Sequence, residues 1–129
     1  MNLKDPKDRK DTPVYSGVLN YFPDALREIA RCSKIGNDQH NPDSDLFWDR
    51  SKSGDELDAL TRHLLEAGTM DSDGIRHSTK VAWRSLANLQ KEIEREREEP
   101  KDALEEMYDE EVLNTHDDWK ELYTNQIKN

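Results

Sequence analysis

The stretch that decides the fold covers residues 71–93 and reads DSDGIRHSTKVAWRSLANLQKEI. Its apolar positions recur at helical spacing, which places them on one side of an α-helix of about six turns. These positions are Ile75, Ala82, Leu86, Leu89 and Ile93. Asp71, Ser72 and Asp73 precede them and predict the start of the helix, and Pro100 predicts its end.

Two further helices are predicted upstream of this stretch. One begins at Pro23, a residue suited to the first helical position, and ends at Gly36. The next begins after Ser53 and Glu56, which match a capping box, and ends at Gly68. Their apolar faces are Leu26, Ile29 and Ala30 in the first helix and Leu57, Leu60 and Leu64 in the second.

Weaker signals complete an all-α prediction. Thr12 offers a helix cap before Pro13, residues 37–52 read as a polar connecting loop, and Thr115 precedes a final short helix. No segment of five or more residues alternates with period two, so strands are not expected. We expect a polar arm over 1–12, a helical domain over 13–99, and acidic helices over 100–129 that cover the core or an oligomer interface.

Composition limits the class of protein. Hydrophobic residues make up 33% of the chain and charged residues 37%, which is enough for one thin core that oligomerisation would help to complete. No apolar run reaches the length of a membrane span, and the N-terminal segment MNLKDPKDRKD lacks the apolar stretch of a secretory signal. The single cysteine, Cys32, excludes an internal disulfide. These features predict a cytoplasmic protein that does not bind membranes.

The net charge of −10 is concentrated in one segment. Residues 92–111 contain eleven acidic and three basic residues, and the rest of the chain is nearly neutral. No basic stripe is present to replace counterions on phosphates, which argues against nucleic-acid binding. The acidic segment is explained by a solvated helical face. It also leaves open a non-catalytic, acidic interaction protein that mimics nucleic-acid charge.

Pairs of acidic and histidine residues lie on three consecutive predicted helices. The pairs are Asp24 with Glu28, Asp55 with Asp58, and Asp73 with His77. Each pair shares a helix face, and each acid in a first turn is also explained by the helix dipole. His63, beside an apolar face, can be a structural histidine or a functional one. Helices that face one another in a bundle can bring such carboxylates to one metal site, where Mg²⁺ or Mn²⁺ would support phosphoanhydride hydrolysis.

Six short motifs, in order, give the chain a family likeness. They are PDALREIA at 23–30, KIGN at 34–37, WD at 48–49, DALTRHL at 58–64, DSDGIRH at 71–77 and AW at 82–83. Over about residues 10–95 the chain resembles the phage dATP/dGTP diphosphohydrolases, a branch of the all-α MazG-like nucleotide pyrophosphohydrolases. The resemblance implies a MazG-like helical bundle, with residues 13–99 as the catalytic domain, assembled as a dimer or tetramer.

The same resemblance implies an activity and a metal site. It implies conversion of dGTP, and as a further candidate dATP, to the monophosphate and pyrophosphate with two or three Mg²⁺ or Mn²⁺ ions. The product dGMP would serve phage synthesis of 2-aminoadenine nucleotides in the host cytoplasm. The implied metal ligands are Asp24, Glu28, Asp55, Asp58 and Asp73. The family's Glu-x-x-Glu and Glu-x-x-Asp motifs differ here, because Asp24 and Glu28 are four apart and Asp55 stands in place of glutamate.

Catalytic and substrate-binding candidates follow from the same comparison. Glu28, Asp58, His63 and His77 are the candidates for catalysis. The candidates for substrate contacts are Lys34, Lys80 and Arg84 at the phosphates, Trp48 stacked on a purine, and Asn37 at the base edge. Trp48 is equally explained as an anchor of the connecting loop. A general nucleoside triphosphate clean-up enzyme would use the same carboxylates and stays open as an alternative.

Overall fold

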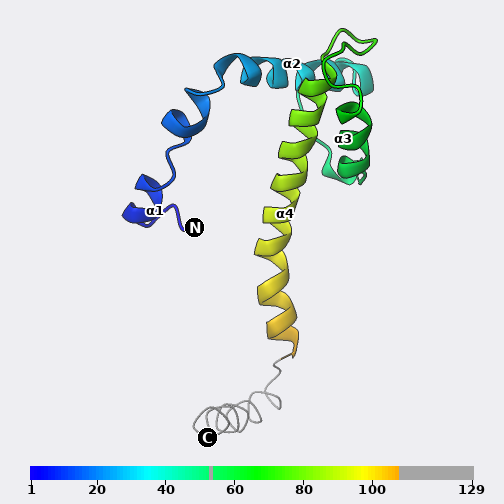
Figure 1. Cartoon of the computed structure of the whole chain (residues 1–129). Helices are drawn as coiled ribbons and strands as arrows, with labels where there is room; N and C mark the ends of the chain where they lie inside the picture. The colour runs from blue at the N-terminus through cyan, green and yellow to red at the C-terminus, as the bar shows by residue number, and fades with distance from the viewer. Residues whose placement is uncertain (53, 108–129) are drawn as a thin grey trace, which may run out of the picture. The chain divides into compact units, whose positions relative to one another are not determined.

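The computed structural model describes residues 1–52 and 54–107, with side chains described through residue 98 (Figure 1). The described elements are α1 (Pro6–Lys10), the π-helical turn η1 (Tyr15–Leu19), α2 (Pro23–His40), the 3₁₀ turn η2 (Arg50–Lys52), α3 (Glu56–Leu64) and α4 (His77–Met107). These residues contain no strand and one isolated β-bridge, so the all-α prediction is confirmed. The chain divides into two compact units, Met1–Asn88 and Leu89–Asn129, and α4 contributes residues to both.

The N-terminal segment is more helical than its sequence predicted. The predicted polar arm contains α1, which Asp5 caps by accepting a hydrogen bond from the backbone N–H of Lys7 at 2.8 Å. The prediction that Thr12 caps a helix was wrong, because its hydroxyl donates to the carbonyl of Asp8 at 2.6 Å. The next helical turn, η1, begins only at Tyr15.

Helix α2 begins at Pro23 as predicted, but it does not end at Gly36. It continues to His40 and ends where Asn41 leaves helical geometry, with φ −136° and ψ 65°. Asn41 precedes Pro42, and the proline ring disfavours helical geometry in the residue before it. The proline therefore ends this helix, and the glycine is an ordinary residue inside it.

Helix α3 is shorter than predicted, because it ends at Leu64 and residues 65–68 form turns. Gly68 has a φ of +91° and lies in the loop that follows, so the prediction that it ends the helix was wrong. At the other end, Ser53 of the predicted capping box lies outside the described residues. Its predicted partner Glu56 is 6% exposed and is buried on α3.

Both predicted ends of the long helix were also wrong. Helix α4 begins at His77, because the segment from Asp71 to Ile75 turns back on itself. The backbone N–H of Asp71 donates to the carbonyl of Ile75 at 2.8 Å, and Gly74 takes a φ of +78°. At the other end the helix passes through Pro100 to Met107, since a proline inside a helix can kink it without ending it. The final predicted helix, after Thr115, lies outside the described residues.

Helices α2 and α4 meet through their polar and aromatic side chains. The indole N–H of Trp83 on α4 donates to the hydroxyl of Ser33 on α2 at 2.6 Å. The ring of Trp48, in the loop after α2, meets Trp83 edge to face, with ring centres 5.7 Å apart. Asn37 is buried and its side chain bonds to the backbone of Ser44 and Phe47, both at 3.4 Å. These contacts fix the loop against the two helices.

The hydrophobic core of the described residues is small. Its buried apolar members are Ala59, Ile75 and Ala87. Many larger apolar side chains are exposed, among them Val14, Tyr15, Val18, Leu19, Tyr21, Phe22, Leu46, Phe47, Leu57, Leu64, Leu86 and Leu89. None of the described helices combines the length and hydrophobicity needed to span a bilayer.

Candidate functional site

The loop between α3 and α4 positions the candidate site. It is closed by a β-bridge between Met70 and Arg76, and the backbone N–H of His77 donates to the carbonyl of Thr69 at 3.1 Å. The carboxylate of Asp73 accepts the backbone N–H of Ile75 at 3.1 Å and stabilises the turn. Because the loop is held at several points, the side chains on it have defined positions relative to the two helices.

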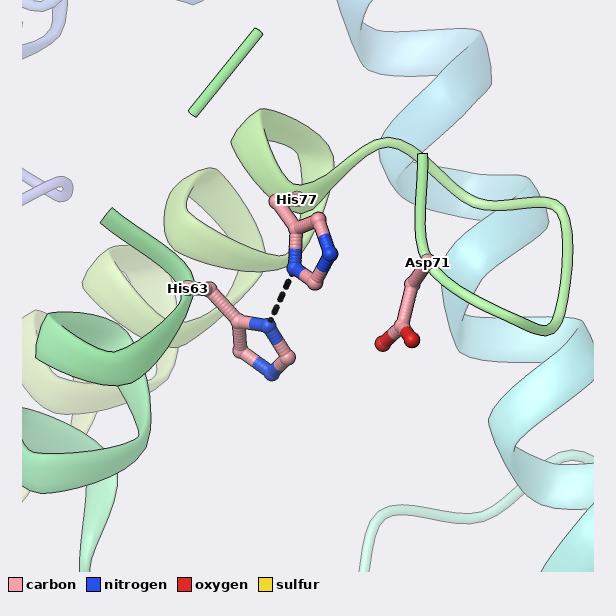
Figure 2. Close-up of side chains that lie close together, drawn as sticks. All are labelled: His63, Asp71 and His77. Atoms are coloured by element: carbon pink, nitrogen blue, oxygen red, sulfur yellow. Dashed lines mark hydrogen bonds between the residues drawn. The ribbon is translucent and has the colours of Figure 1, made fainter. Parts of the chain in front are cut away.

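Two histidines meet across this junction. The Nδ1 atoms of His63 on α3 and His77 on α4 are 2.9 Å apart, and the rings are joined by the dashed line in Figure 2. His77 is buried, with a side chain that is 7% exposed, and its Nε2 lies 3.5 Å from the carboxylate of Glu66. A contact between two Nδ1 atoms requires a proton on one of them and a lone pair on the other. The pair can therefore accept, hold or pass on a proton.

Asp71 is the third member of this group. One ligand atom each from His63, Asp71 and His77 lies within 4.8 Å of the others, and in the described part of the chain this is the group that could hold a metal ion. Figure 2 shows the Asp71 carboxylate on the loop beside the two rings. We call these three residues the junction cluster. They bring two imidazole nitrogens and one carboxylate oxygen to the same point.

Lys80 holds the two carboxylates of the junction loop, Asp71 and Asp73, in place. Its ammonium group lies 2.6 Å from the carboxylate of Asp71 and 2.7 Å from that of Asp73, and all three side chains are largely buried. The hydrogen bond from Lys80 lowers the pKa of Asp71 to about 2. Burial alone would lower the pKa of Lys80, but its bonds to the two carboxylates outweigh burial and raise it. The junction cluster therefore contains an ionised carboxylate, and the cation of Lys80 is fixed beside it.

The electrostatic surroundings also act on His63. Burial lowers its pKa, and the positive charge of Lys80 and the neighbouring His77 lower it further. A lowered pKa keeps the imidazole neutral near pH 7, which is the form that accepts a proton or binds a metal. The geometry thus places a neutral base beside a cation and an ionised acid.

Residues 4–101 match the model of the family described as dATP/dGTP diphosphohydrolase, N-terminal. The chain belongs to this family. No curated protein and no solved structure gives a significant match to it. Membership in the diphosphohydrolase family supports hydrolase activity and a nucleotide substrate, and it confirms the resemblance drawn from the sequence motifs. The junction cluster lies entirely within the matched residues.

The carboxylates predicted as metal ligands have varied surroundings in this family member. Asp24 is exposed and pairs with Arg27 at 2.7 Å, whereas Glu28 is half-buried on the same helix. Asp55 pairs with Arg62 at 3.1 Å, which lowers the pKa of Asp55. Asp58 is exposed on α3. None of these four belongs to the junction cluster, so their role as ligands stays a prediction.

Asp73 and His77 were expected four apart on one helix face, and this was wrong because Asp73 precedes α4. Asp73 instead reaches the site through its ion pair with Lys80, which does lie on α4. The structure brings together the predicted catalytic histidines, His63 and His77. The sequence predicted both histidines as candidates but did not predict that their side chains contact each other.

The predicted substrate-binding residues are engaged in contacts within the protein. Lys34 pairs with Asp38 at 2.7 Å, and the guanidinium of Arg84 lies 5.5 Å from the Trp83 ring centre. The guanidinium of Arg50 lies 4.1 Å from the ring centre of Trp48. Lys80 and Asn37 make the ion pairs and loop contacts described above. A nucleotide would therefore have to compete with, or add to, existing interactions at these positions.

Two residues of the site were not among the sequence candidates. Asp71 lies in the motif at 71–77, but its position before the apolar stripe indicates only a helix start, so the sequence does not single it out. Its distance from Lys80, nine positions along the chain, concealed the ion pair. Glu66 lies in the turn after α3 and faces His77. No sequence pattern would have identified it, since its contact depends on the fold of the loop.

Proposed function

We propose that this diphosphohydrolase family member converts dGTP, and as a second substrate dATP, to the nucleoside monophosphate and pyrophosphate in a metal-dependent reaction. The observation that carries the proposal is the family match over residues 4–101, which includes the whole junction cluster. The proposal extends to phage purine nucleotide metabolism in the host cytoplasm, where dGMP would supply 2-aminoadenine nucleotide synthesis.

The residues of the junction suit parts of this reaction. A water molecule that attacks a phosphorus atom must lose a proton, and a neutral imidazole of His63 or His77 can take it. Lys80 and Arg84 carry positive charge on the same helix and can stabilise the charge that develops on the leaving pyrophosphate. Lys80 would do so only by sharing its ammonium group with Asp71 and Asp73.

A divalent metal would add electrostatic stabilisation and would lower the pKa of a bound water. Glu28, Asp55 and Asp58 are the carboxylates proposed to hold Mg²⁺ or Mn²⁺, with Asp24 or Asp73 completing the set. Asp55 and Asp73 already pair with Arg62 and Lys80, so they would have to share their oxygens with the ion. Carboxylates have lone pairs left for such sharing.

Assembly into a dimer or tetramer belongs to the same proposal. The buried apolar residues of the described chain are few, while side chains such as Tyr15 at 71% exposure and Phe22 at 54% are open to solvent. Exposed apolar surface of this extent is typical of a protein–protein interface. Light scattering coupled to gel filtration measures the mass in solution. A monomer at micromolar concentration would contradict this part of the proposal.

The reaction is tested by analysing the products of the purified full chain. Each of dGTP, dATP, dCTP, dTTP and the four ribonucleotides is incubated with Mg²⁺, with Mn²⁺ or with EDTA. We expect dGMP and pyrophosphate from dGTP, metal dependence, and slow turnover of pyrimidine nucleotides. Comparable rates on all eight nucleotides would instead identify a general clean-up enzyme. Absence of turnover under every condition would favour the acidic interaction protein.

A further inference from the structure

The contact between the two histidines needs either a hydrogen atom or a metal ion between the facing Nδ1 atoms. A neutral imidazole has one protonated and one unprotonated nitrogen. If both facing Nδ1 atoms were unprotonated, their lone pairs would repel at the observed separation of 2.9 Å. Either a proton or a metal ion must therefore lie between His63 and His77. The other nitrogen of each ring, Nε2, decides between these two possibilities, because a proton on Nε2 leaves the lone pair on Nδ1.

Glu66 acts on the far nitrogen of one ring. Its carboxylate lies 3.5 Å from Nε2 of His77, on the side of the ring away from His63. A carboxylate at this position favours a proton on Nε2 and leaves the lone pair of His77 on Nδ1. Histidines that bind metals usually donate their second N–H to a carboxylate or carbonyl in this way. Glu66 thus orients the His77 lone pair toward the junction cluster.

Asp71 supplies an anionic oxygen as the third ligand atom of the junction cluster. Lys80 and the backbone N–H of Ser72 hold its carboxylate at 2.6 Å each, and the hydroxyl of Ser72 donates to it at 3.3 Å. A carboxylate offers about four lone-pair positions, so these three bonds leave one position for a further contact. The group therefore combines two nitrogens and one oxygen on elements that are fixed by the closed loop.

The distances fit a single ion. Two nitrogens that bind one six-coordinate ion at about 2.1 Å and at right angles are about 3.0 Å apart, close to the 2.9 Å between the histidines. Ligand atoms on opposite sides of such an ion are about 4.2 Å apart, against the 4.8 Å limit within which all three ligand atoms lie.

We infer that His63, Asp71 and His77 form a binding site for one divalent transition-metal ion, such as Mn²⁺, Co²⁺ or Zn²⁺, and that Mg²⁺ does not occupy it. Imidazole ligands suit these ions, whereas Mg²⁺ prefers oxygen ligands throughout its coordination shell. The ion would supply Lewis acidity beside a fixed lysine. The inference concerns binding alone and is tested without nucleotide, so its failure would leave the proposed hydrolysis of dGTP untouched. With the ion bound, His63 and His77 would act as its ligands in place of the base role proposed above.

Cobalt binding by the full chain tests the site without any nucleotide. Co²⁺ bound to nitrogen and oxygen ligands absorbs visible light, which reports its stoichiometry and ligand set. We expect saturable absorption at one ion per chain, loss of the signal on addition of Zn²⁺, and no loss with a large excess of Mg²⁺. Lack of saturable binding, or displacement by Mg²⁺, would overturn the inference.

Variants locate the ion at the junction. His63→Gln and Asp71→Asn should each weaken Co²⁺ binding strongly, and Glu66→Gln should weaken it by about 10–100-fold through His77. The matched control is the double variant His40→Gln/His116→Gln, which removes the other two histidines of the chain. It should bind as the wild type does. Loss of binding in the control, with retention in His63→Gln, would place the ion elsewhere.

A second measurement uses the unmodified sequence, so it does not depend on whether a variant folds. In the ¹⁵N-labelled full chain, Zn²⁺ should move the Nδ1 resonances of His63 and His77 and leave that of His40 in place. Unchanged Nδ1 resonances of both junction histidines at saturating Zn²⁺ would show that a proton, and not a metal ion, joins the two rings.

Discussion

The start of α2 and the junction between α3 and α4 both carry acidic residues beside apolar positions, but their side chains are held differently. Asp24 on α2 is 94% exposed in an ion pair with Arg27, a residue three positions away. At the junction, Lys80 is 17% exposed and joins two carboxylates from another segment of the chain. Ion pairs between exposed neighbours on a helix contribute little, whereas partly buried contacts between segments fix geometry.

This difference indicates where the chain is preorganised. The loop of the junction is closed by backbone hydrogen bonds, and its histidines, acids and lysine contact one another across α3, the loop and α4. On α2, Asp24 is exposed and contacts only a neighbour on its own helix in the pair with Arg27. A preorganised group is better suited to hold a reacting water or an ion, because little reorganisation is needed during the reaction.

The largest expected effect is a loss of dGTP hydrolysis, which we expect to differ between a variant at the junction and a variant on α2. His63→Gln should reduce dGTP hydrolysis by about 10²–10⁴-fold, the range typical of the loss of a general base. Glu28→Gln should reduce it less, by about tenfold, because Glu28 contributes at most part of a shared ligand set. The measurement is the rate of pyrophosphate release at saturating metal.

The control for this comparison is Asp45→Asn, an exposed acid outside both regions, which should retain the wild-type rate. Circular dichroism of each variant confirms that it is folded. An equal loss in both test variants would mean that α2 is as much a part of the reaction site as the junction. Unchanged activity in His63→Gln would remove the junction from the mechanism.

The next largest effect is a loss of stability, which we expect to differ between substitutions of two lysines. Lys80→Met leaves two largely buried carboxylates without their cation and should lower the free energy of unfolding by about 2 kcal/mol. Lys34→Met breaks an exposed pair with Asp38, so a change of about 0.5 kcal/mol or less is expected. Urea unfolding at pH 7 in EDTA measures both values. Similar losses in the two variants would show that the junction is no more rigidly held than the surface of α2.

A smaller change in stability, of opposite sign at the two positions, is expected from substitution of two glycines. Gly74→Ala places a Cβ on a residue with φ +78° in the junction loop and should destabilise the protein by about 1 kcal/mol. Gly36→Ala lies inside α2, where an added Cβ meets no atom within 4 Å, and should stabilise it by about 0.5–1 kcal/mol. Thermal unfolding of both variants checks the opposite signs. Stabilisation by Gly74→Ala would show that the loop adopts another conformation.

The smallest effect is a rate difference at Cys32, on α2. Burial raises the pKa of its thiol, so less of the reactive thiolate is present at pH 8 than in an unperturbed cysteine. Alkylation by iodoacetamide should therefore be slower in the folded chain than in the chain unfolded in urea, and should still be rising with pH above pH 9. Equal rates in the two states would indicate that this side of α2 is open to solvent.

Sequence patterns were most reliable where the cause is local. Pro23 fixes the start of α2 because its ring sets a helical φ and its missing N–H is not needed there. Gly36 and Gly68 were misassigned as helix ends, because glycine is permitted in several conformations and its neighbours decide which is adopted. Pro100 was misassigned because the φ that its ring fixes is also a helical φ, so a helix can pass through it. The motifs, read in order, identified the family correctly.

The sequence by itself determined that the chain is all-α, that its core is thin, and that His63 and His77 are candidates for chemistry. Helical periodicity, composition and short motifs contain this information, because each depends on neighbours along the chain. The tertiary structure alone decided that the two rings face each other at 2.9 Å, with Asp71 beside them and Lys80 between two acids. Those contacts depend on a loop closed by its own backbone hydrogen bonds, which brings residues up to seventeen positions apart, from His63 to Lys80, into one site.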